Sequence, residues 1–396
     1  MRTLQSLVLT FLFAASSASA EDLLPVDAEE AVAFGERFAR VALGEEPGGL
    51  GEVMAVDEMV EESLRAVALP AAEAAAFRTG LKRSLLGDGF LAAIRKSVGA
   101  DGSLEVLNTR LEDGRRVVRL RMLGANDGGV NYYDLPLKRT RSGVIAEDVY
   151  IYMTGEWLTE TIANTARTMF EVPPPGLLDR LRGRDGRRAA VDGMGKAQKA
   201  FKAGRFAEVL EVTDGVPKDL RESKMIVTMR LLSAAELDDG RYAAALAEHR
   251  RLFPEDPSRD FIAIDHHVLK GETAEAVAAV DAMYERTEDP YLKMLSGSLL
   301  IEAGDAAAAI PRVEASIEGE PGRVDAHWTA VTAYVMTKRH ADTLRALKRL
   351  DGVAKLEWGD LSENEFYKDF AASPQYAEWL AYLDQKAAAA EPGGGD

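Results

Sequence analysis

The chain contains no cysteine among its 396 residues. Disulfide bonds, thiol catalysis, iron–sulfur ligation and a lipidated N-terminal cysteine are therefore excluded. Long apolar segments are also missing, because the apolar stretch at residues 7–15 falls well short of the roughly 20 residues that span a bilayer. With 47% hydrophobic residues, the chain can still bury two or more cores by packing alone.

Positive charge is scarce. Lys and Arg number 48 against 65 Asp and Glu, which gives a net charge of −17. The deficit is spread along the chain, since residues 21–170 carry 17 basic against 25 acidic side chains, and residues 191–396 carry 25 against 37. Phosphate-binding surfaces need clustered cations, so the composition predicts no nucleic-acid partner and disfavours an anionic membrane surface.

Residues 1–20 have the pattern of a secretory signal peptide. Arg2 is followed by the apolar stretch and then by small residues that end in Ala18-Ser19-Ala20. The pattern predicts cleavage before Glu21 and an exported protein, periplasmic or secreted, with no stable membrane anchor after cleavage. The alternative is an uncleaved N-terminal anchor.

A proline- and arginine-rich stretch, residues 171–192, divides the chain. It opens with EVPPPG, and consecutive prolines stop a helix because each lacks a backbone N–H and restricts the residue before it. We predict an α+β domain over residues 21–170, then this linker, then helices. The arginines are either a solvated linker or a basic hinge that contacts an acidic neighbour.

Helical periodicity in the first domain gives way to strand-like alternation after residue 100. The predicted helices cover residues 26–43, 50–69 and 71–98, the predicted strands 103–112, 115–123, 130–138 and 144–153, and a last helix 156–170. Helices packed on a curved antiparallel sheet form an α+β layer. This order, with YYD in one strand and DVYIYMTGEW in the next, resembles the nuclear-transport-factor-two-like (cystatin-like) superfamily, which includes both enzymes and binding modules.

The third and fourth predicted strands carry the candidate catalytic residues. A turn centred on Arg141 sets Asp134 opposite Asp148 and Tyr132 opposite Tyr150. Two adjacent carboxylates raise one pKa and can supply a general acid or base. A register two residues longer instead sets Asp134 opposite Tyr150, which gives a simple hydrogen bond. Residues 21–170 contain no histidine, so catalysis here depends on Asp and Tyr alone.

The second half is predicted to be an array of helix pairs. Four segments share one layout, with a glycine at 204, 240, 271 and 304 and spacings of 36, 31 and 33 residues. This resembles the tetratricopeptide repeat family, whose period is about 34 residues. We predict an all-α solenoid over residues 193–353, in which Lys338-Arg339 replaces the glycine of a fifth unit. Capping helices over 354–386 and a disordered tail, 387–396, follow.

In this family the first helix of each pair lines a concave groove. The family's groove-facing positions lie 13, 10, 6 and 3 residues before each glycine. The resemblance therefore implies a mostly apolar groove that binds a protein or peptide segment, such as an amphipathic helix. The alternative is that the chain's own C-terminal helix or N-terminal domain fills the groove. The predicted partner-binding residues are Arg230, Leu237, Phe261, Asp265, Val268, Tyr291, Met294 and Ile301.

The sequence favours neither a metal nor a cofactor. The segment IDHHV at 264–268 is the one histidine-rich stretch, but adjacent residues on a helix point about 100° apart. Three classes of function stay open: an exported, non-enzymatic interaction scaffold, which we favour; an Asp/Tyr-based enzyme whose repeats recruit a substrate; and a module that binds a small apolar ligand.

Overall fold

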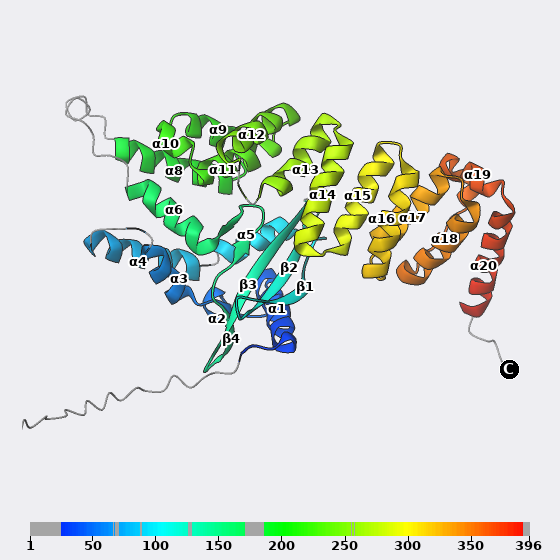
Figure 1. Ribbon diagram of the computed structural model, residues 1–396, viewed down its shortest axis with the longest axis horizontal. Coiled ribbons are helices and arrows are strands. Elements are labelled where there is room, and N and C mark those ends of the chain that lie inside the picture. Colours follow the sequence, from blue (N-terminus) through cyan, green and yellow to red (C-terminus); the bar gives the residue numbers. More distant parts are fainter. Residues whose placement is uncertain are drawn as a thin grey trace, which may run out of the picture. The chain divides into compact units, whose positions relative to one another are not determined.

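An antiparallel sheet with helices is followed along the chain by a long all-helical region in the computed structural model (Figure 1). The structure describes residues 25–65, 67, 71–87, 89–125, 129–170, 186–254, 256 and 258–390. Two compact units share the chain: unit 1 comprises Met1–Glu62 and Ala71–Val149, and unit 2 comprises Ser63–Pro70 and Tyr150–Asp396. These observations confirm a sheet with helices and an all-helical region.

Three predicted segments fall outside the described residues: the signal peptide, residues 171–185 of the linker, and residues 391–396 of the tail. The units divide at Val149/Tyr150, whereas we placed the end of the first domain at residue 170. The domain boundary itself stays a prediction. No helix among the described residues is both long enough and apolar enough to cross a membrane.

The helices at the start of the chain are α1 (Ala28–Leu43), α2 (Leu50–Val53), α3 (Val56–Arg65), α4 (Ala71–Leu86) and α5 (Gly89–Val98). Helix α1 begins with a capping box, because the Asp27 side chain accepts from the Glu30 N–H and the Glu30 side chain accepts from the Asp27 N–H. It ends at Gly44, whose φ of 81° is the left-handed conformation that closes a helix.

The strands of unit 1 are β1 (Ser103–Glu112), β2 (Arg115–Leu123), β3 (Val130–Thr140) and β4 (Gly143–Ala146). Strand β2 pairs antiparallel with both β1 and β3, and β4 pairs with β3. Helix α1 packs closely on one face, since a Cβ at Gly35 would lie 2.7 Å from Val106 and 2.8 Å from Val118. The core therefore lies between α1 and this face of the sheet.

Both predicted registers between the third and fourth strands are wrong. Thr140 pairs with Gly143, so the turn consists of Arg141 and Ser142 alone, where we expected a turn centred on one residue. Strand β4 then ends at Ala146, which means that the predicted strand 144–153 is not continuous. Asp134 instead pairs across the sheet with Arg119 of β2. The two carboxylates of the predicted pair are therefore not cross-strand neighbours.

Unit 2 begins with a short hairpin. Strand β5 (Tyr150–Ile151) pairs with β6 (Glu156–Trp157), and Gly155 closes the turn with a φ of 62°. Helix α6 (Leu158–Phe170) follows directly, in place of the predicted helix 156–170. Residues 150–157, which we assigned partly to a strand and partly to a helix, thus form a short hairpin.

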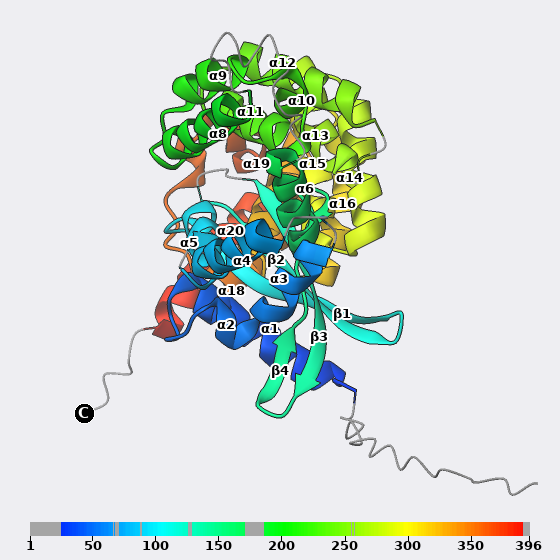
Figure 2. The same cartoon turned by 90° about the vertical axis from the view of Figure 1, so that its left-hand side faces the viewer.

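The helical region continues in antiparallel pairs that follow an arc from α9 to α16 when seen end-on (Figure 2). The first helices of the pairs are α8 (Gly186–Lys202), α11 (Lys224–Ala235), α13 (Arg259–Lys270), α15 (Pro290–Glu302) and α17 (Val324–Met336). The second helices are α9 (Phe206–Asp214), α12 (Asp239–Leu252), α14 (Thr273–Thr287), α16 (Ala306–Gly319) and α18 (His340–Ala354). A short helix, α10 (Lys218–Arg221), lies between the first two pairs.

The repeat period is more regular than the glycines indicated. The second helices begin at residues 206, 239, 273, 306 and 340, so successive starts lie 33, 34, 33 and 34 residues apart. This agrees with the tetratricopeptide period of about 34. We define the turn position as the residue two before each start, which gives Gly204, Leu237, Gly271, Gly304 and Lys338. Gly240 was the wrong reference, because it lies inside α12.

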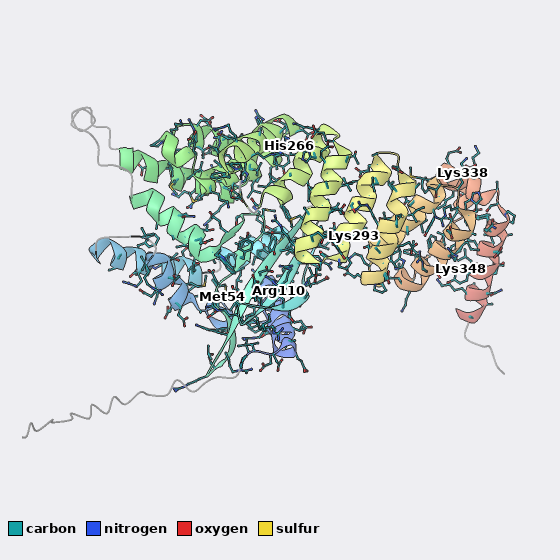
Figure 3. All side chains as sticks on the ribbon, viewed as in Figure 1. Met54, Arg110, His266, Lys293, Lys338 and Lys348 are labelled. Atoms are coloured by element: carbon teal, nitrogen blue, oxygen red, sulfur yellow. The ribbon has the colours of Figure 1, made fainter. Side chains whose placement is uncertain are left out.

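The fifth repeat keeps the backbone geometry of the turn without a glycine. Lys338, labelled in Figure 3, has a φ of 55°. This is close to the 69°, 68° and 84° of Gly204, Gly271 and Gly304. Lys338 therefore performs the same left-handed turn at a steric cost that the glycines avoid.

The array ends in two 3-10 turns, η1 (Leu361–Glu363) and η2 (Glu365–Tyr367), followed by α19 (Lys368–Ala371) and α20 (Pro374–Ala390). Phe370 and Trp379 are among the largest fully buried side chains. They belong to one buried cluster with residues of α17 and α18, which covers the open end of the solenoid.

Candidate protein-interaction surface

The corrected turn positions change which residues face the groove implied by the family resemblance. Counting 13, 10, 6 and 3 residues before Leu237 selects Lys224, Val227, Leu231 and Ala234 in the second repeat. The third and fourth repeats keep the positions counted from Gly271 and Gly304, and the fifth gains Asp325, Trp328, Thr332 and Val335.

Arg230 and Leu237 leave the groove-facing set. Arg230 donates to Thr213 Oγ1 at 2.6 Å and to Asp214 Oδ1 at 2.8 Å, so it ties α11 to the end of α9. Leu237 occupies the turn position of its repeat. Arg230 therefore supports the array, and partner binding by Arg230 and Leu237 stays a prediction.

The other predicted groove residues differ in exposure. Val268 is 43% exposed, whereas Phe261, Tyr291 and Ile301 are half-buried. Met294 is only 7% exposed and belongs to the buried cluster that contains Trp379. The side chain of Asp265 lies outside the described residues. Met294 is thus a core residue, and partner binding by the predicted groove residues stays a prediction.

An aromatic platform, which we did not predict, lies at the C-terminal end of the array. We define it as Trp328, Trp358, Trp379 and Tyr382, whose successive ring centroids lie 5.7, 5.0 and 5.5 Å apart. Trp379 is fully buried, and Trp328 at the outer end is 37% exposed. The sequence did contain a signal for Trp328, since it lies ten residues before Lys338 at a groove-facing position.

A buried carboxylate holds the platform in place. Asp351, in α18 and 3% exposed, accepts hydrogen bonds from Trp358 Nε1 at 2.8 Å, Tyr382 Oη at 2.7 Å and Lys386 Nζ at 2.5 Å. Burial by itself would raise the pKa of Asp351, but these three donors outweigh it and hold the pKa below the usual range. The ionised carboxylate therefore fixes the platform that supports Trp328.

The β5–β6 hairpin contacts the first groove-facing positions of the second and third repeats. Lys224 forms ion pairs with Asp256 and, at 3.8 Å, with Glu156 of the hairpin. Ser258 is only 1% exposed and donates its N–H to Asp256 at 2.8 Å. Lys224 and Ser258 are the first groove-facing positions of the second and third repeats, so the chain itself contacts these two positions.

A cavity of about 440 Å³ lies beside this contact. Glu156, Lys224, Asp256 and Gly155 form part of its wall. Its remaining lining residues mix hydrogen-bonding and apolar side chains: Thr161, Asn164, Ser223, Met225 and Phe253. Sequence reasoning missed this site, because residues 156 and 224 are far apart in the chain and no shared motif marks them.

Among the candidate catalytic residues, Asp134 is bound by two arginines. Asp134, 3% exposed, accepts from Arg119 at 2.7 and 2.9 Å and from Arg110 at 2.7 Å (Arg110 is labelled in Figure 3). Burial would raise the pKa of Asp134, but the two guanidinium groups outweigh it and lower the pKa. A carboxylate held in this way is a weak base, and it stabilises the sheet by pairing β1, β2 and β3.

The other three candidates lie in β3, in the segment after β4 and in β5. Tyr132 is fully buried in β3. Asp148 accepts from the Val149 N–H at 2.8 Å in the bend after β4. Tyr150 lies in unit 2, where its ring meets those of Tyr152 and Trp157 at 5.2 and 5.3 Å. A catalytic role for these residues stays a prediction.

The segment IDHHV forms part of α13, and its side chains make local contacts. His267 Nδ1 lies 2.6 Å from Glu272 Oε2, next to the turn position of the repeat. His266 is 7% exposed, and burial lowers its pKa. Across the described residues, no three side chains of His, Asp or Glu gather in a way that could hold a metal ion.

Comparison with known proteins gives a partial likeness. No protein-family model and no curated protein matches the chain. The crystal structure of MamA protein is similar to 45% of this chain over 96% of MamA, with 14% identity and a TM-score of 0.37. A structure of MamA AMB-1 is similar over 44% and 97%, with 16% identity and a TM-score of 0.36. Likeness at this level carries no functional argument, so the repeat assignment rests on the helix pairs and their period.

Proposed function

We propose that this chain is an exported protein-interaction scaffold whose repeats bind a segment of a partner protein. The partner segment lies along the groove-facing side of the first helices and is anchored at Trp328. Unit 1 is, in this proposal, a nuclear-transport-factor-two-like (cystatin-like) module that orients the array. The signal-peptide pattern supports export, and the order of helices and antiparallel strands supports the module.

A single observation carries the proposal: Trp328 is exposed at a groove-facing position and rests on a fixed aromatic platform. Its exposed fraction is 37%, and Trp358 behind it is held by the hydrogen bond to Asp351. A tryptophan that is already ordered loses little conformational entropy on binding, and tryptophan is enriched among residues that dominate interface energies. The half-buried Tyr291 and Phe261 extend the apolar surface toward the third repeat.

An amphipathic helix is the partner segment that this surface suits best. The groove-facing residues from the third to the fifth repeat are mainly apolar or aromatic, and helix-in-groove recognition uses apolar anchors spaced along one helical face. Proteins that expose such residues together use them for binding, because isolated soluble proteins rarely leave large apolar patches uncovered.

Trp328→Ala tests the proposal against a matched control, Met336→Ala. Both residues are large, exposed and on α17, but Met336 is 42% exposed and lies outside the groove-facing set. We expect the full-length protein to capture a reproducible partner from the exported fraction of its own cells. Trp328→Ala should weaken that capture by more than about 2 kcal/mol, and Met336→Ala should leave it unchanged. Equal effects of the two substitutions, or no partner at all, would contradict the proposal.

A further inference from the structure

The turn of the β5–β6 hairpin is seated on the first groove-facing positions of two neighbouring repeats, Lys224 and Ser258. Glu156 of the hairpin lies 3.8 Å from the Lys224 ammonium. Gly155 packs tightly against the third repeat. A Cβ added to it would lie 2.7 Å from Asp256 Oδ1 and 2.8 Å from the Ser258 nitrogen. The contact therefore has no room for even a methyl group.

Two features favour glycine at position 155 and hold it in the turn. Its φ of 62° is left-handed, a conformation that residues with side chains rarely adopt. Its N–H donates to Ile151 O at 2.8 Å across the hairpin. The turn presents Glu156 toward Lys224 in a fixed position. Glu156 is further oriented by Thr161 Oγ1 at 2.9 Å and Asn164 Nδ2 at 3.2 Å.

The two carboxylates on Lys224 are not equivalent. Asp256, from the segment before α13, is in direct contact with the ammonium, whereas Glu156 lies at 3.8 Å, beyond ordinary hydrogen-bond length. Side-chain exposures of 14% for Lys224 and 15% for Glu156 keep the pair away from most of the solvent. Asp256 thus belongs to the repeats, and Glu156 is the carboxylate that the hairpin contributes.

We propose that Lys224 and Ser258 form a peptide-docking site for a glycine followed by an acidic residue, and that the β5–β6 hairpin is its resident ligand. A partner that carries a Gly-Glu segment displaces the hairpin and places its carboxylate at Lys224. Met225 and Phe253, which line the adjoining cavity, stay with the repeats. This inference rests on the proposed scaffold function and names the chemistry of one partner segment.

An intramolecular ligand competes strongly, because its tether gives it an effective concentration in about the millimolar range. The unmodified protein should therefore bind an added peptide weakly. Weakening the hairpin contact should open the site without altering Lys224 or Ser258. The substitution Gly155→Ala does this, since it adds a methyl group where none fits and disfavours the left-handed turn.

The test uses the full-length protein and a fluorescein-labelled peptide with the sequence of residues 150–165, YIYMTGEWLTETIANT, followed by fluorescence anisotropy. We expect Gly155→Ala to bind the peptide at least about tenfold more tightly than the unmodified protein, which is the scale of removing a tethered competitor. Gly322→Ala is the matched control, because no atom lies within 4 Å of its added Cβ. It should behave as the unmodified protein.

Two further arms make the result specific. Adding Lys224→Gln to Gly155→Ala should abolish the gain, and so should a peptide in which the glutamate of Gly-Glu is replaced by glutamine. If Gly155→Ala does not fold, as judged by circular dichroism, Glu156→Lys replaces it, because like charges at Lys224 also expel the hairpin. Equal peptide affinity in the unmodified and opened proteins, or a gain that does not depend on Lys224, overturns the inference.

The outcome separates this inference from the scaffold proposal. If the peptide binds no variant while partner capture still depends on Trp328, the hairpin is an ordinary structural contact and the scaffold proposal stands. If the opened protein binds the peptide through Lys224 but no capture depends on Trp328, the docking site is real and the proposed anchor at the other end is wrong.

Discussion

Replacing Asp351 by alanine should unfold the C-terminal end of the array at lower denaturant concentration. The substitution removes the acceptor for Trp358 Nε1 and Tyr382 Oη and leaves the partner charge of Lys386 behind. An unsatisfied buried donor costs about 1–3 kcal/mol. Lys386 is 43% exposed, so water recovers most of its charge and its pair adds less than about 1 kcal/mol. With two such donors, the expected total loss is about 2–7 kcal/mol of unfolding free energy.

Tryptophan fluorescence during urea unfolding measures this loss directly. Three of the four tryptophans belong to the platform, so the signal reports mainly on this end of the chain. Repeat arrays unfold through units coupled to their neighbours, so the fluorescence transition should move to lower urea while much of the helical circular dichroism persists. The control is Asp360→Ala, in which an exposed carboxylate loses its bonds to Tyr376 and Ser362. An unchanged fluorescence midpoint in Asp351→Ala, or an equal shift in Asp360→Ala, would refute the reasoning.

Two other predictions concern the turns and the sheet. Lys338→Gly should stabilise the array by about 0.5–1 kcal/mol, because glycine adopts the φ of 55° without strain. Gly304→Ala should destabilise the array, because the left-handed φ of 84° strains a residue with a side chain. Thermal unfolding of both variants checks these two expectations. The pKa of Asp134 is lowered in the folded protein, so its contribution is present above the unfolded value of about 3.9 and is lost as the pH falls through the lower folded value. Acid titration followed by near-ultraviolet circular dichroism of tyrosine should show this loss of stability. Asp134→Asn should abolish this pH dependence and should cost about 3–5 kcal/mol of unfolding free energy at neutral pH. A variant as stable as the unmodified protein would show that the arginines are satisfied without Asp134.

The local parts of the fold were predictable from sequence. Strands β1 and β2 begin and end at the predicted residues, because alternation and the turn residues Asp113 and Gly114 define them without long-range information. The break after Ala146 was not predictable, since the residues beyond it keep the same alternation although β4 has ended. A two-residue turn differs from a three-residue turn by one register step, and that step decided whether Asp134 faced a carboxylate.

In the repeats, too, some features were predictable from the sequence and others were not. Gly204, Gly271 and Gly304 gave the period because a left-handed turn favours glycine. The first helix of the second repeat ends without a left-handed residue. We therefore took Gly240, three residues after the turn position Leu237, as the reference. That choice moved Lys224 out of the groove-facing set. The contact of Lys224 with Glu156 depends on how strand β6 packs against helix α11, which lies far from it in the sequence, and no local pattern encodes that packing.

Photo-crosslinking from position 328 tests the scaffold account most directly. A photoreactive aromatic amino acid, which keeps a large ring at the anchor position, replaces Trp328 or, in a parallel protein, Met336, and both full-length proteins are irradiated in the cells that make them. The account predicts a partner crosslinked from position 328 in the exported fraction and none from position 336, which lies on the same helix outside the groove-facing set. Crosslinks that are equally frequent at both positions, or absent from position 328, would contradict it.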